Sequence, residues 1–185
     1  MVANYNEVLY QNHRIETKRL ILRRFELRDA ADLLEYASDA ATVEFLIWDG
    51  VQTIEAATAS IYDYYWSRPG IWAVELTTEG KMIGCIDTRV ITTHDRVEFG
   101  YVFNRKYWNK GYATEALRAV TELCFDKLHT NRVAAQHYAE NGGSGRVMEK
   151  AGMKREGCLR QHEIVKGKLR DCVQYGIVRG DYYVH

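Results

Sequence analysis

The clearest change of pattern lies in the middle of the chain. From Arg96 to Phe103, apolar side chains alternate with polar or small ones, which is the period-two pattern of a strand with two different faces. From Ala113 onward, the apolar positions recur every three or four residues, as in a helix that buries one stripe. The sequence therefore predicts a strand, a turn at Gly111 and a helix that ends near Leu128.

The same patterns predict further strands and helices along the chain. The strands are expected at 17–23, 71–76, 82–91, 132–138, 154–165 and 169–179, and the helices at 30–37, from 54 to near 69, and from 141 to 152. Asp29 and Thr53 are expected to cap the helices that follow them. A strand, a helix and a second strand predict a right-handed crossover, so strand 132–138 should lie parallel to strand 96–103.

The first turn of the helix after Gly111 is a predicted anion site. The amide N–H groups there have no partner inside the helix, and the helix dipole adds partial positive charge. Gly111 has no Cβ to hold a ligand away, and Lys110 adds a full charge. A phosphate or pyrophosphate would fit. A Rossmann-type nucleotide site is disfavoured, because its fingerprint needs three glycines directly after a strand.

Residues 107–117 read YWNKGYATEAL, which strongly resembles the acyl-CoA pyrophosphate loop of the GNAT superfamily, Gln/Arg-x-x-Gly-x-Gly/Ala. Trp108 stands where Gln or Arg is usual, a substitution that resembles the RimJ/RimL branch, the protein N-terminal-alanine acetyltransferases. Asn109 replaces a common glycine and tolerates positive φ better than most residues. The resemblance spans 17–182.

Residues 141–153, NGGSGRVMEKAGM, are similar to the family's Asn-x-x-Ser-x-x-Val-x-Glu-Lys-x-Gly-Phe, with Met153 in place of the aromatic residue. Three glycines, Gly142, Gly143 and Gly145, depart from that pattern. Each glycine inside a helix costs up to about 1 kcal/mol relative to alanine. We therefore expect a looser helix start and a weaker placing of Asn141 and Ser144.

The resemblance implies the GNAT fold, a mixed α/β architecture in a single domain over 1–185. Its sheet is mixed and mostly antiparallel, with six to seven strands, two splayed parallel central strands and about four flanking helices. Residues 1–14 are polar and weakly patterned, so we expect them to form an N-terminal extension. The resemblance also makes a homodimer one expected arrangement.

The same resemblance implies acetyl-CoA as the cosubstrate and direct attack of an amine on its thioester. It implies neither a metal nor a covalent enzyme intermediate. Backbone groups at the end of strand 96–103 would pair with the pantetheine arm, the loop would hold the pyrophosphate, and the Asn141 side chain would bind the arm. The implied cofactor-binding residues are Tyr101, Val102, Phe103, Trp108, Asn109, Lys110, Gly111, Tyr112, Ala113, Thr114 and Asn141.

Glu98, on the strand beside the thioester, is the first candidate for a general base, acting through a water. The alternative is an ordinary carboxylate paired with Arg96 or a neighbouring lysine. His137 is a second candidate base, although its alternation with apolar neighbours favours a packed core histidine. Ser144 is the candidate donor to the leaving thiolate, with a plain helix cap as its alternative, and Tyr138 is a weaker donor.

The acceptor amine stays open at this stage. A protein N-terminal α-amine is the branch's namesake substrate, while polyamines and amine-bearing antibiotics are acetylated on the same scaffold. A non-catalytic acyl-CoA-binding module is the alternative from another class. The aromatic residues of the two early helices and their loop are candidates for the substrate wall, and we expect one or two of them to contact substrate: Phe45, Trp48, Tyr62, Tyr65 and Trp66.

Composition narrows the context. Twenty-five basic and 25 acidic residues give a net charge of zero with no basic run, so nucleic-acid and membrane partners are not expected. The four cysteines lie far apart without C-x-x-C spacing and at no activating turn, which predicts reduced core thiols. No long apolar stretch occurs and none follows Met1, so we expect a soluble, cytoplasmic protein.

Overall fold

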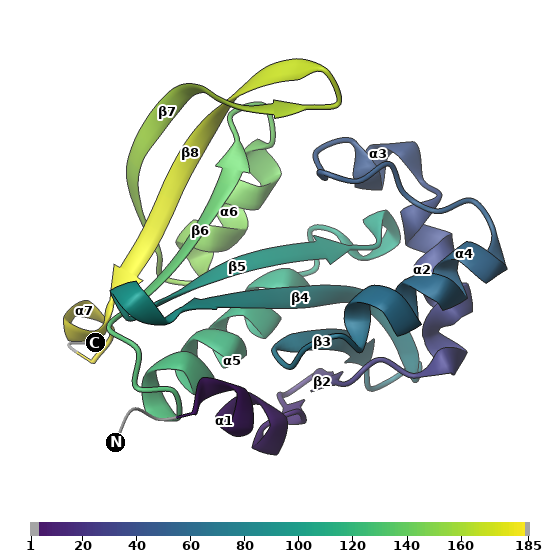
Figure 1. The fold of residues 1–185 in the computed structure, drawn as a ribbon, viewed down its shortest axis with the longest axis horizontal. Coiled ribbons are helices and arrows are strands. Elements are labelled where there is room, and N and C mark those ends of the chain that lie inside the picture. Colours follow the sequence, from purple (N-terminus) through teal and green to yellow (C-terminus); the bar gives the residue numbers. More distant parts are fainter. Residues whose placement is uncertain (1–3, 184–185) are drawn as a thin grey trace.

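The computed structural model describes residues 4–183 and contains one eight-stranded sheet (Figure 1). The strands are β1 (Ile15–Glu16), β2 (Leu20–Arg23), β3 (Ile71–Leu76), β4 (Lys81–Ile91), β5 (Arg96–Phe103), β6 (Arg132–Tyr138), β7 (Lys154–Val165) and β8 (Lys168–Val178). Their order across the sheet is β1-β2-β3-β4-β5-β6-β8-β7, and β5 with β6 is the parallel pair. The expected GNAT-type mixed sheet is confirmed, with β1 as one strand more than predicted.

Helices cover both faces of this sheet. They are α1 (Tyr5–Gln11), α2 (Ala30–Ala37), α3 (Ala40–Val43), α4 (Ile54–Ser60), α5 (Tyr112–Asp126), α6 (Gly142–Lys150) and α7 (Arg179–Tyr182). A π-helical turn, Ile61–Tyr65, extends α4. Among the described residues, no helix is long and apolar enough to cross a membrane.

Two apolar cores lie on opposite faces of the sheet. The apolar stripe of α5, with Met148 of α6, packs on one face, and α2 with α4 packs on the other. Strand β5 contributes to both cores because its side chains alternate: Phe99 and Phe103 join the first core and Val102 joins the second. The sheet therefore separates the α5 side of the molecule from the α2–α4 side.

Strands β5 and β6 pair over only part of their length. Their parallel register runs from Arg96 opposite Arg132 to Phe99 opposite Ala135 and then ends, although both strands continue. The Asn104 N–H donates to the Ile83 carbonyl at 2.8 Å, which fixes the antiparallel register with β4. Peptide groups alternate in direction along a strand, so those of Tyr101 and Phe103 face the gap toward β6.

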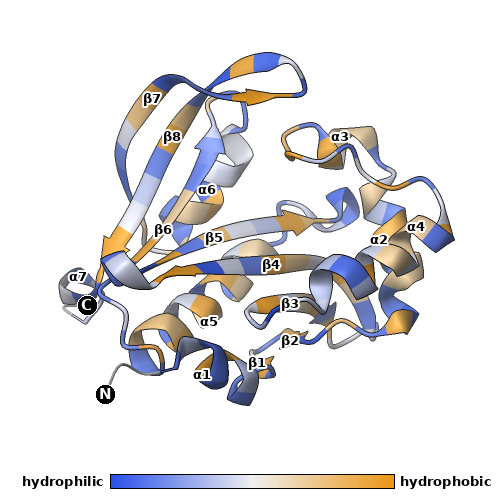
Figure 2. Cartoon of the chain, viewed as in Figure 1, coloured by the Kyte–Doolittle hydropathy of each residue, from blue (hydrophilic) through white to orange (hydrophobic). Residues whose placement is uncertain are grey.

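Strands β7 and β8 form a long hairpin beyond the body of the sheet, at the top of Figure 1. Hydropathy changes from residue to residue along it (Figure 2), and most of β7 is exposed. At the tip, Lys166 Nζ donates to the Val43 carbonyl of α3 at 2.8 Å. The hairpin thus contacts a segment more than 100 residues away in sequence.

Three local expectations need correction. Asp29 does not cap α2 with its side chain, because its carboxylate binds Arg23 and the Glu26 N–H instead. The expected N-terminal extension contains α1, whose Leu9 is only 2 % exposed and belongs to the α5-side core; residues 1–3 lie outside the described residues. Cys158 is exposed, while the other three thiols are buried as predicted. Thr53 caps α4 as expected, accepting from the Ala56 N–H at 3.2 Å.

The buried pair of Arg23 and Asp29 predicts a large stability effect. Both residues are more than 90 % buried, and two N–H···O bonds of 2.8 and 2.7 Å join them. Asp29→Ala leaves the guanidinium uncompensated and should lower the free energy of unfolding by about 3–5 kcal/mol in urea titrations. Glu16→Ala removes an exposed pair with Arg14 and should cost less than about 1 kcal/mol. Equal losses in the two variants would contradict this assignment.

Candidate active site

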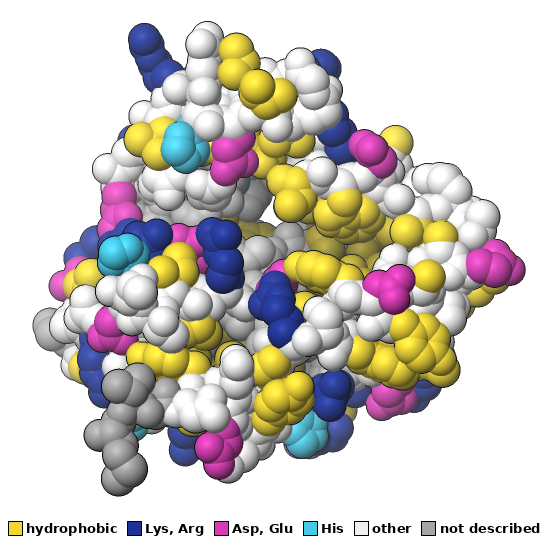
Figure 3. All heavy atoms as spheres, viewed as in Figure 1, with side chains coloured by type: hydrophobic (Ala, Val, Ile, Leu, Met, Phe, Trp, Pro, Cys, Tyr) yellow, Lys and Arg dark blue, Asp and Glu magenta, His cyan; other side chains and the backbone are white. Residues whose placement is uncertain are grey.

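A cavity of about 740 Å³ lies where β5 and β6 separate. Figure 3 shows it as a hollow at the centre of the molecule, with hydrophobic side chains along its right-hand wall. The sheet forms its floor, and the segment from α2 to the end of the π-helical turn forms that wall. Side chains on the wall are mostly apolar or aromatic, and they include Leu33, Phe45, Leu46, Ile47, Trp48, Val51, Tyr64 and Tyr65.

The centre of the floor is open because Gly100 stands there. A Cβ built on Gly100 would meet no atom within 4 Å, and its φ is not in the left-handed region. A side chain at this position would therefore occupy the cavity without straining the backbone. Asp87 of β4, paired with Gly100 across the strands, lines the cavity beside this opening.

The carboxylate of Asp87 is already engaged. Arg68 forms an ion pair with it, and the Tyr64 hydroxyl donates to it. Burial and this hydrogen bond raise the pKa of Tyr64 to about 12, so the phenol stays protonated. The polar part of the right-hand wall is therefore an approximately neutral cluster rather than a free negative charge.

Two hydroxyl groups meet at the opposite side of the gap. The Tyr101 hydroxyl donates to the Ser144 carbonyl at 3.0 Å and lies 2.8 Å from Ser144 Oγ. Burial raises the pKa of Tyr101 well above its ordinary value, although the hydrogen bond with Ser144 opposes the shift. Both groups line the cavity and both carry protons at neutral pH.

The start of α6 is held by Asn141 rather than by Ser144. Asn141 Oδ1 accepts from the Ser144 N–H at 3.3 Å, so Ser144 lies in the first turn with its hydroxyl free of a capping role. The interpretation of Ser144 as a plain cap is therefore wrong. Asn141 also lines the cavity.

His137 explains one of the unexpected glycines. A Cβ on Gly145 would lie 2.7 Å from His137 Nε2, a distance that real Cβ atoms essentially never show. Nδ1 of the same ring lies 2.8 Å from the Tyr138 carbonyl, and the residue is 9 % exposed. His137 is thus a packed histidine at the cavity edge, the alternative favoured by its alternation with apolar neighbours.

Glu163, which the sequence did not single out, reaches the cavity from β7. Its carboxylate accepts from the Tyr138 hydroxyl at 2.7 Å and from the Gln136 amide at 2.6 Å, and both donors line the cavity. Burial, followed by the hydrogen bond to Glu163, raises the pKa of Tyr138. The edge strand of the sheet therefore places a carboxylate one hydrogen bond behind the cavity surface.

Glu98 has other partners. Its carboxylate binds Arg96 at 2.9 Å and also Arg89, and Glu98 does not line the cavity. Glu98 is therefore paired with Arg96, as in the alternative to its role as a general base. The geometry supplies no direct contact between this carboxylate and the cavity.

The loop before α5 has the shape expected of an anion site. Asn109 and Gly111 both have positive φ, 60° and 82°, which Asn and Gly tolerate better than other residues. The first helical backbone bond runs from the Glu115 N–H to the Gly111 carbonyl at 3.0 Å. The amides of Tyr112 to Thr114 therefore have no acceptor inside the helix.

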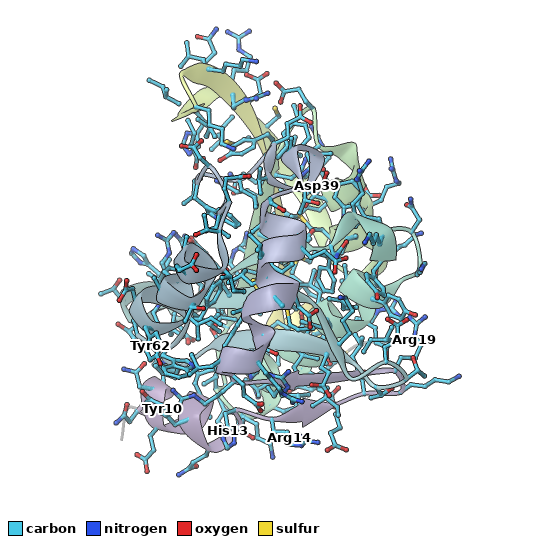
Figure 4. All side chains as sticks on the ribbon, turned by 90° about the vertical axis from the view of Figure 1, so that its right-hand side faces the viewer. Tyr10, His13, Arg14, Arg19, Asp39 and Tyr62 are labelled. Carbon is cyan, nitrogen blue, oxygen red and sulfur yellow. The ribbon has the colours of Figure 1, made fainter. Side chains whose placement is uncertain are left out.

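Contacts from Arg19, directly before β2, and from the end of β5 position this loop. Arg19 binds Glu115 at 2.6 Å, donates to the Lys110 carbonyl at 3.0 Å and stacks on Tyr112. Trp108 Nε1 donates to the Phe103 carbonyl at 2.7 Å, which ties the loop to the end of β5. Figure 4 shows Arg19 and Tyr62 on opposite sides of α2, so the loop and the α4 side of the cavity are well separated.

The sequence matches the family description "Acetyltransferase (GNAT) domain" over residues 19–154. The chain belongs to the GNAT acetyltransferase family. It is 38 % identical over 147 residues to "Uncharacterized N-acetyltransferase YnaD" of Bacillus subtilis (strain 168), covering 80 % of this chain and 86 % of that protein. A GNAT-family acetyltransferase structure from Bacillus anthracis matches with a TM-score of 0.82 at 32 % identity, covering 90 % of this chain and 99 % of that one.

A third, partial match carries a named substrate. The Escherichia coli (strain K12) alanine N-acetyltransferase of ribosomal protein uS5 is 28 % identical over 83 residues, covering 45 % of this chain and 43 % of that protein. GNAT acetyltransferases use acetyl-CoA, and the loop described above suits its pyrophosphate. No cluster of three or more His, Cys, Asp or Glu side chains suited to a metal ion occurs within residues 4–183.

The cavity brings together part of the predicted set. Four of the predicted residues line it: Tyr101, Val102, Asn141 and Ser144. The backbone of Val102 is paired with β4, however, and faces away from the gap. Of the five candidate wall aromatics, Phe45, Trp48 and Tyr65 line the cavity, but Tyr62 and Trp66 do not. Tyr64, Gln136, Asp87 and Glu163 were missed, because contacts between distant strands and helices bring them to the cavity.

The contact between Gly145 and His137 gives a second prediction. Gly145→Ala forces the ring to move and should lower the free energy of unfolding by about 1–3 kcal/mol, the usual cost of overpacking. Gly142→Ala, in the same helix turn, meets no atom closer than 3.7 Å and should raise it by up to about 1 kcal/mol. Chemical denaturation of both variants measures the contrast. A similar gain in both variants would show that His137 does not pack on Gly145.

Proposed function

We propose that the protein transfers the acetyl group of acetyl-CoA to an α-amine, most directly the N-terminal amine of a protein chain, as in the RimJ/RimL branch. The observation that carries this proposal is the chemistry of the cavity. Its wall is largely apolar, and its one lining carboxylate, Asp87, is paired with Arg68. A polyamine or an aminoglycoside needs several unpaired carboxylates to replace its water, and the described cavity residues provide none.

The acid–base properties of the acceptor point the same way. An α-amino group has an ordinary pKa near 7.7–8.0, whereas an alkylamine has one near 10.4. A substantial fraction of an α-amine is therefore neutral at pH 7 without a strong base. The partial relative from Escherichia coli named for an N-terminal alanine supports this class of acceptor.

Glu163 supplies the proton acceptor in this proposal. Tyr138 donates its proton to Glu163 and leaves a phenol lone pair toward the cavity. An amine N–H donated to that lone pair gives a path by which the proton passes to Tyr138 while the Tyr138 proton moves to Glu163. Tyr138 thereby serves as a relay rather than as the donor to the thiolate.

Ser144 donates a hydrogen bond to the sulfur of the leaving thiolate, which takes its proton from solvent. When Tyr101 donates to the Ser144 carbonyl, Ser144 Oγ–H is free to point into the gap between β5 and β6. The backbone groups of Tyr101 and the N–H of Phe103 face the same gap and suit the pantetheine amides, whereas the Phe103 carbonyl is bound by Trp108. Asn141 also lines the cavity. The amides after Gly111, together with Lys110, suit the pyrophosphate.

Filling the floor of the cavity tests the acceptor site. Gly100→Val places its side chain in open space, so the fold and the affinity for acetyl-CoA should be retained. Acetyl transfer to a peptide N-terminus should fall by about 100-fold, because the amine can no longer reach its position. Mass spectrometry follows the product, and calorimetry follows acetyl-CoA binding. The control is Lys127→Gln, because Lys127 is exposed and does not line the cavity. Gly80→Val is not used as a control, because Gly80 has a positive φ of 61°.

Three results of that assay count against the proposal. Wild-type protein that binds acetyl-CoA but acetylates no peptide would favour a binding module. Faster transfer to polyamines or aminoglycosides than to peptides would favour a small-amine acetyltransferase. Unchanged peptide transfer in Gly100→Val would place the acceptor elsewhere.

A pair of isosteric variants tests the proton path. Glu163→Gln cannot accept a proton and should lower kcat/KM by about 100-fold, with the remaining activity rising toward high pH as more amine becomes neutral. Glu98→Gln changes an ion pair outside the cavity and should change kcat/KM by less than about threefold. A larger effect in Glu98→Gln would restore Glu98 as the base.

A further inference from the structure

A second, smaller cavity lies between α3 and the tip of the β7–β8 hairpin. Its volume is about 390 Å³, and it is lined by Ala40, Ala41, Glu44, Lys166, Lys168 and Arg170. Three cations and one carboxylate thus meet in one hollow of a chain whose net charge is zero. Nothing in the proposed acetyl transfer uses these groups.

The three cations differ in how fully they are engaged. Lys166 is held by the Val43 carbonyl and lies 3.8 Å from Asp49. Lys168 is exposed and forms no ion pair with any residue in the described part of the chain. It is therefore the cation with the most freedom to bind a ligand.

Arg170 carries an unmet hydrogen-bonding need. One terminal nitrogen binds Glu140 at 2.8 Å, but Nε is buried and has no hydrogen-bond partner among residues 4–183. A buried N–H without an acceptor loses its hydrogen bonds to water without replacement, which is why such groups are rare in proteins. A carboxylate is the acceptor that best matches a guanidinium group.

This basic hollow adjoins the main cavity through Phe45. The Phe45 side chain lines the main cavity, and the Arg170 guanidinium lies 5.7 Å from its ring centroid. Phe45 also packs against Tyr138 and Val165, so the hollow lies on the Tyr138 side of the main cavity. When a peptide enters the main cavity with its N-terminal amine first, one of its later residues would lie beside the hollow.

We infer that the hollow formed by Lys166, Lys168 and Arg170 binds a carboxylate of the acceptor, supplied by an acidic residue a few positions after the reacting N-terminus. This inference rests on the proposed function and adds a charge preference to it. The acceptor's carboxylate pairs with Lys168 and with the Arg170 guanidinium, both of which line the hollow, while the apolar main cavity holds the first side chain. Because Lys168 is exposed, its share of the attraction is screened by salt.

The test compares short peptides that begin with alanine and differ only in carrying Glu or Gln at the second, third or fourth position. Wild-type protein should acetylate at least one Glu peptide with a kcat/KM about tenfold above its Gln partner at low ionic strength, mainly through KM. The ratio should shrink as salt is added. Lys168→Gln should bring the ratio close to one, and Lys168→Glu should invert it.

Lys127→Gln is the matched control, since Lys127 is exposed and follows the far end of α5 from the loop. It should keep the full ratio of wild-type protein. Arg170→Lys keeps the charge but loses the guanidinium geometry, and it should lower the ratio without removing its salt dependence. These two variants separate recognition in the hollow from a general effect of lysine loss.

The outcomes distinguish a failure of the carboxylate site from a failure of the proposed acetyl transfer. Equal kcat/KM for Glu and Gln peptides at every position, with both acetylated, overturns the carboxylate site and leaves the transferase intact. A preference that survives unchanged in Lys168→Glu also overturns it. Failure to acetylate any peptide, despite binding of acetyl-CoA, overturns the proposed function itself. Preference for free phenylalanine over phenylalaninamide and over every peptide would assign the carboxylate to an amino acid and overturn the peptide form.

Discussion

The separation of β5 from β6 after Phe99 is the constraint on which the rest of the site depends. Two parallel strands that stay paired leave no peptide groups for a ligand, whereas here the Tyr101 backbone groups and the Phe103 N–H face the gap, and the Phe103 carbonyl accepts from Trp108. Beside the gap, the Tyr101 hydroxyl contacts Ser144 in the first turn of α6, and the His137 ring of β6 packs on Gly145 of the same turn. The start of α6 is thus tied to both strands at the point where they separate.

The sheet also divides the two substrates. The loop before α5 lies on the side of the α5 core, and the apolar wall lies on the side of the α2–α4 core, so they meet only through the gap. Arg19, directly before β2, and the Phe103 carbonyl at the end of β5 hold the loop, while the wall comes from the segment that runs from α2 to the end of the π-helical turn. The acceptor proposed above depends on the second of these arrangements, the apolar wall.

Local pattern carried most of the fold. The alternation of apolar residues predicted β5 and β6 at the bounds that the structure has, and the change of period predicted α5. Both predictions succeeded because burial of one face imposes a periodic pattern of apolar residues. Asp29 was misassigned because a buried arginine competed successfully for its carboxylate. Glu163 and Asp87 were missed for another reason: their hydrogen-bond partners, Tyr138 and Tyr64, lie 25 and 23 residues away in sequence. Tyr101 was expected to contribute its backbone, and only the approach of α6 reveals its hydroxyl.

The three glycines of α6 looked like a uniform weakness in the sequence, yet they are unequal in the structure. Gly145 is required by the ring above it, whereas Gly142 and Gly143 touch nothing closely. Positions 137 and 145 are consequently epistatic. A smaller residue at 137 should remove the cost of a side chain at 145, so the effects of the two substitutions are not additive. The neighbouring glycines have no such partner closer than 3.7 Å, and changes there should add independently of position 137.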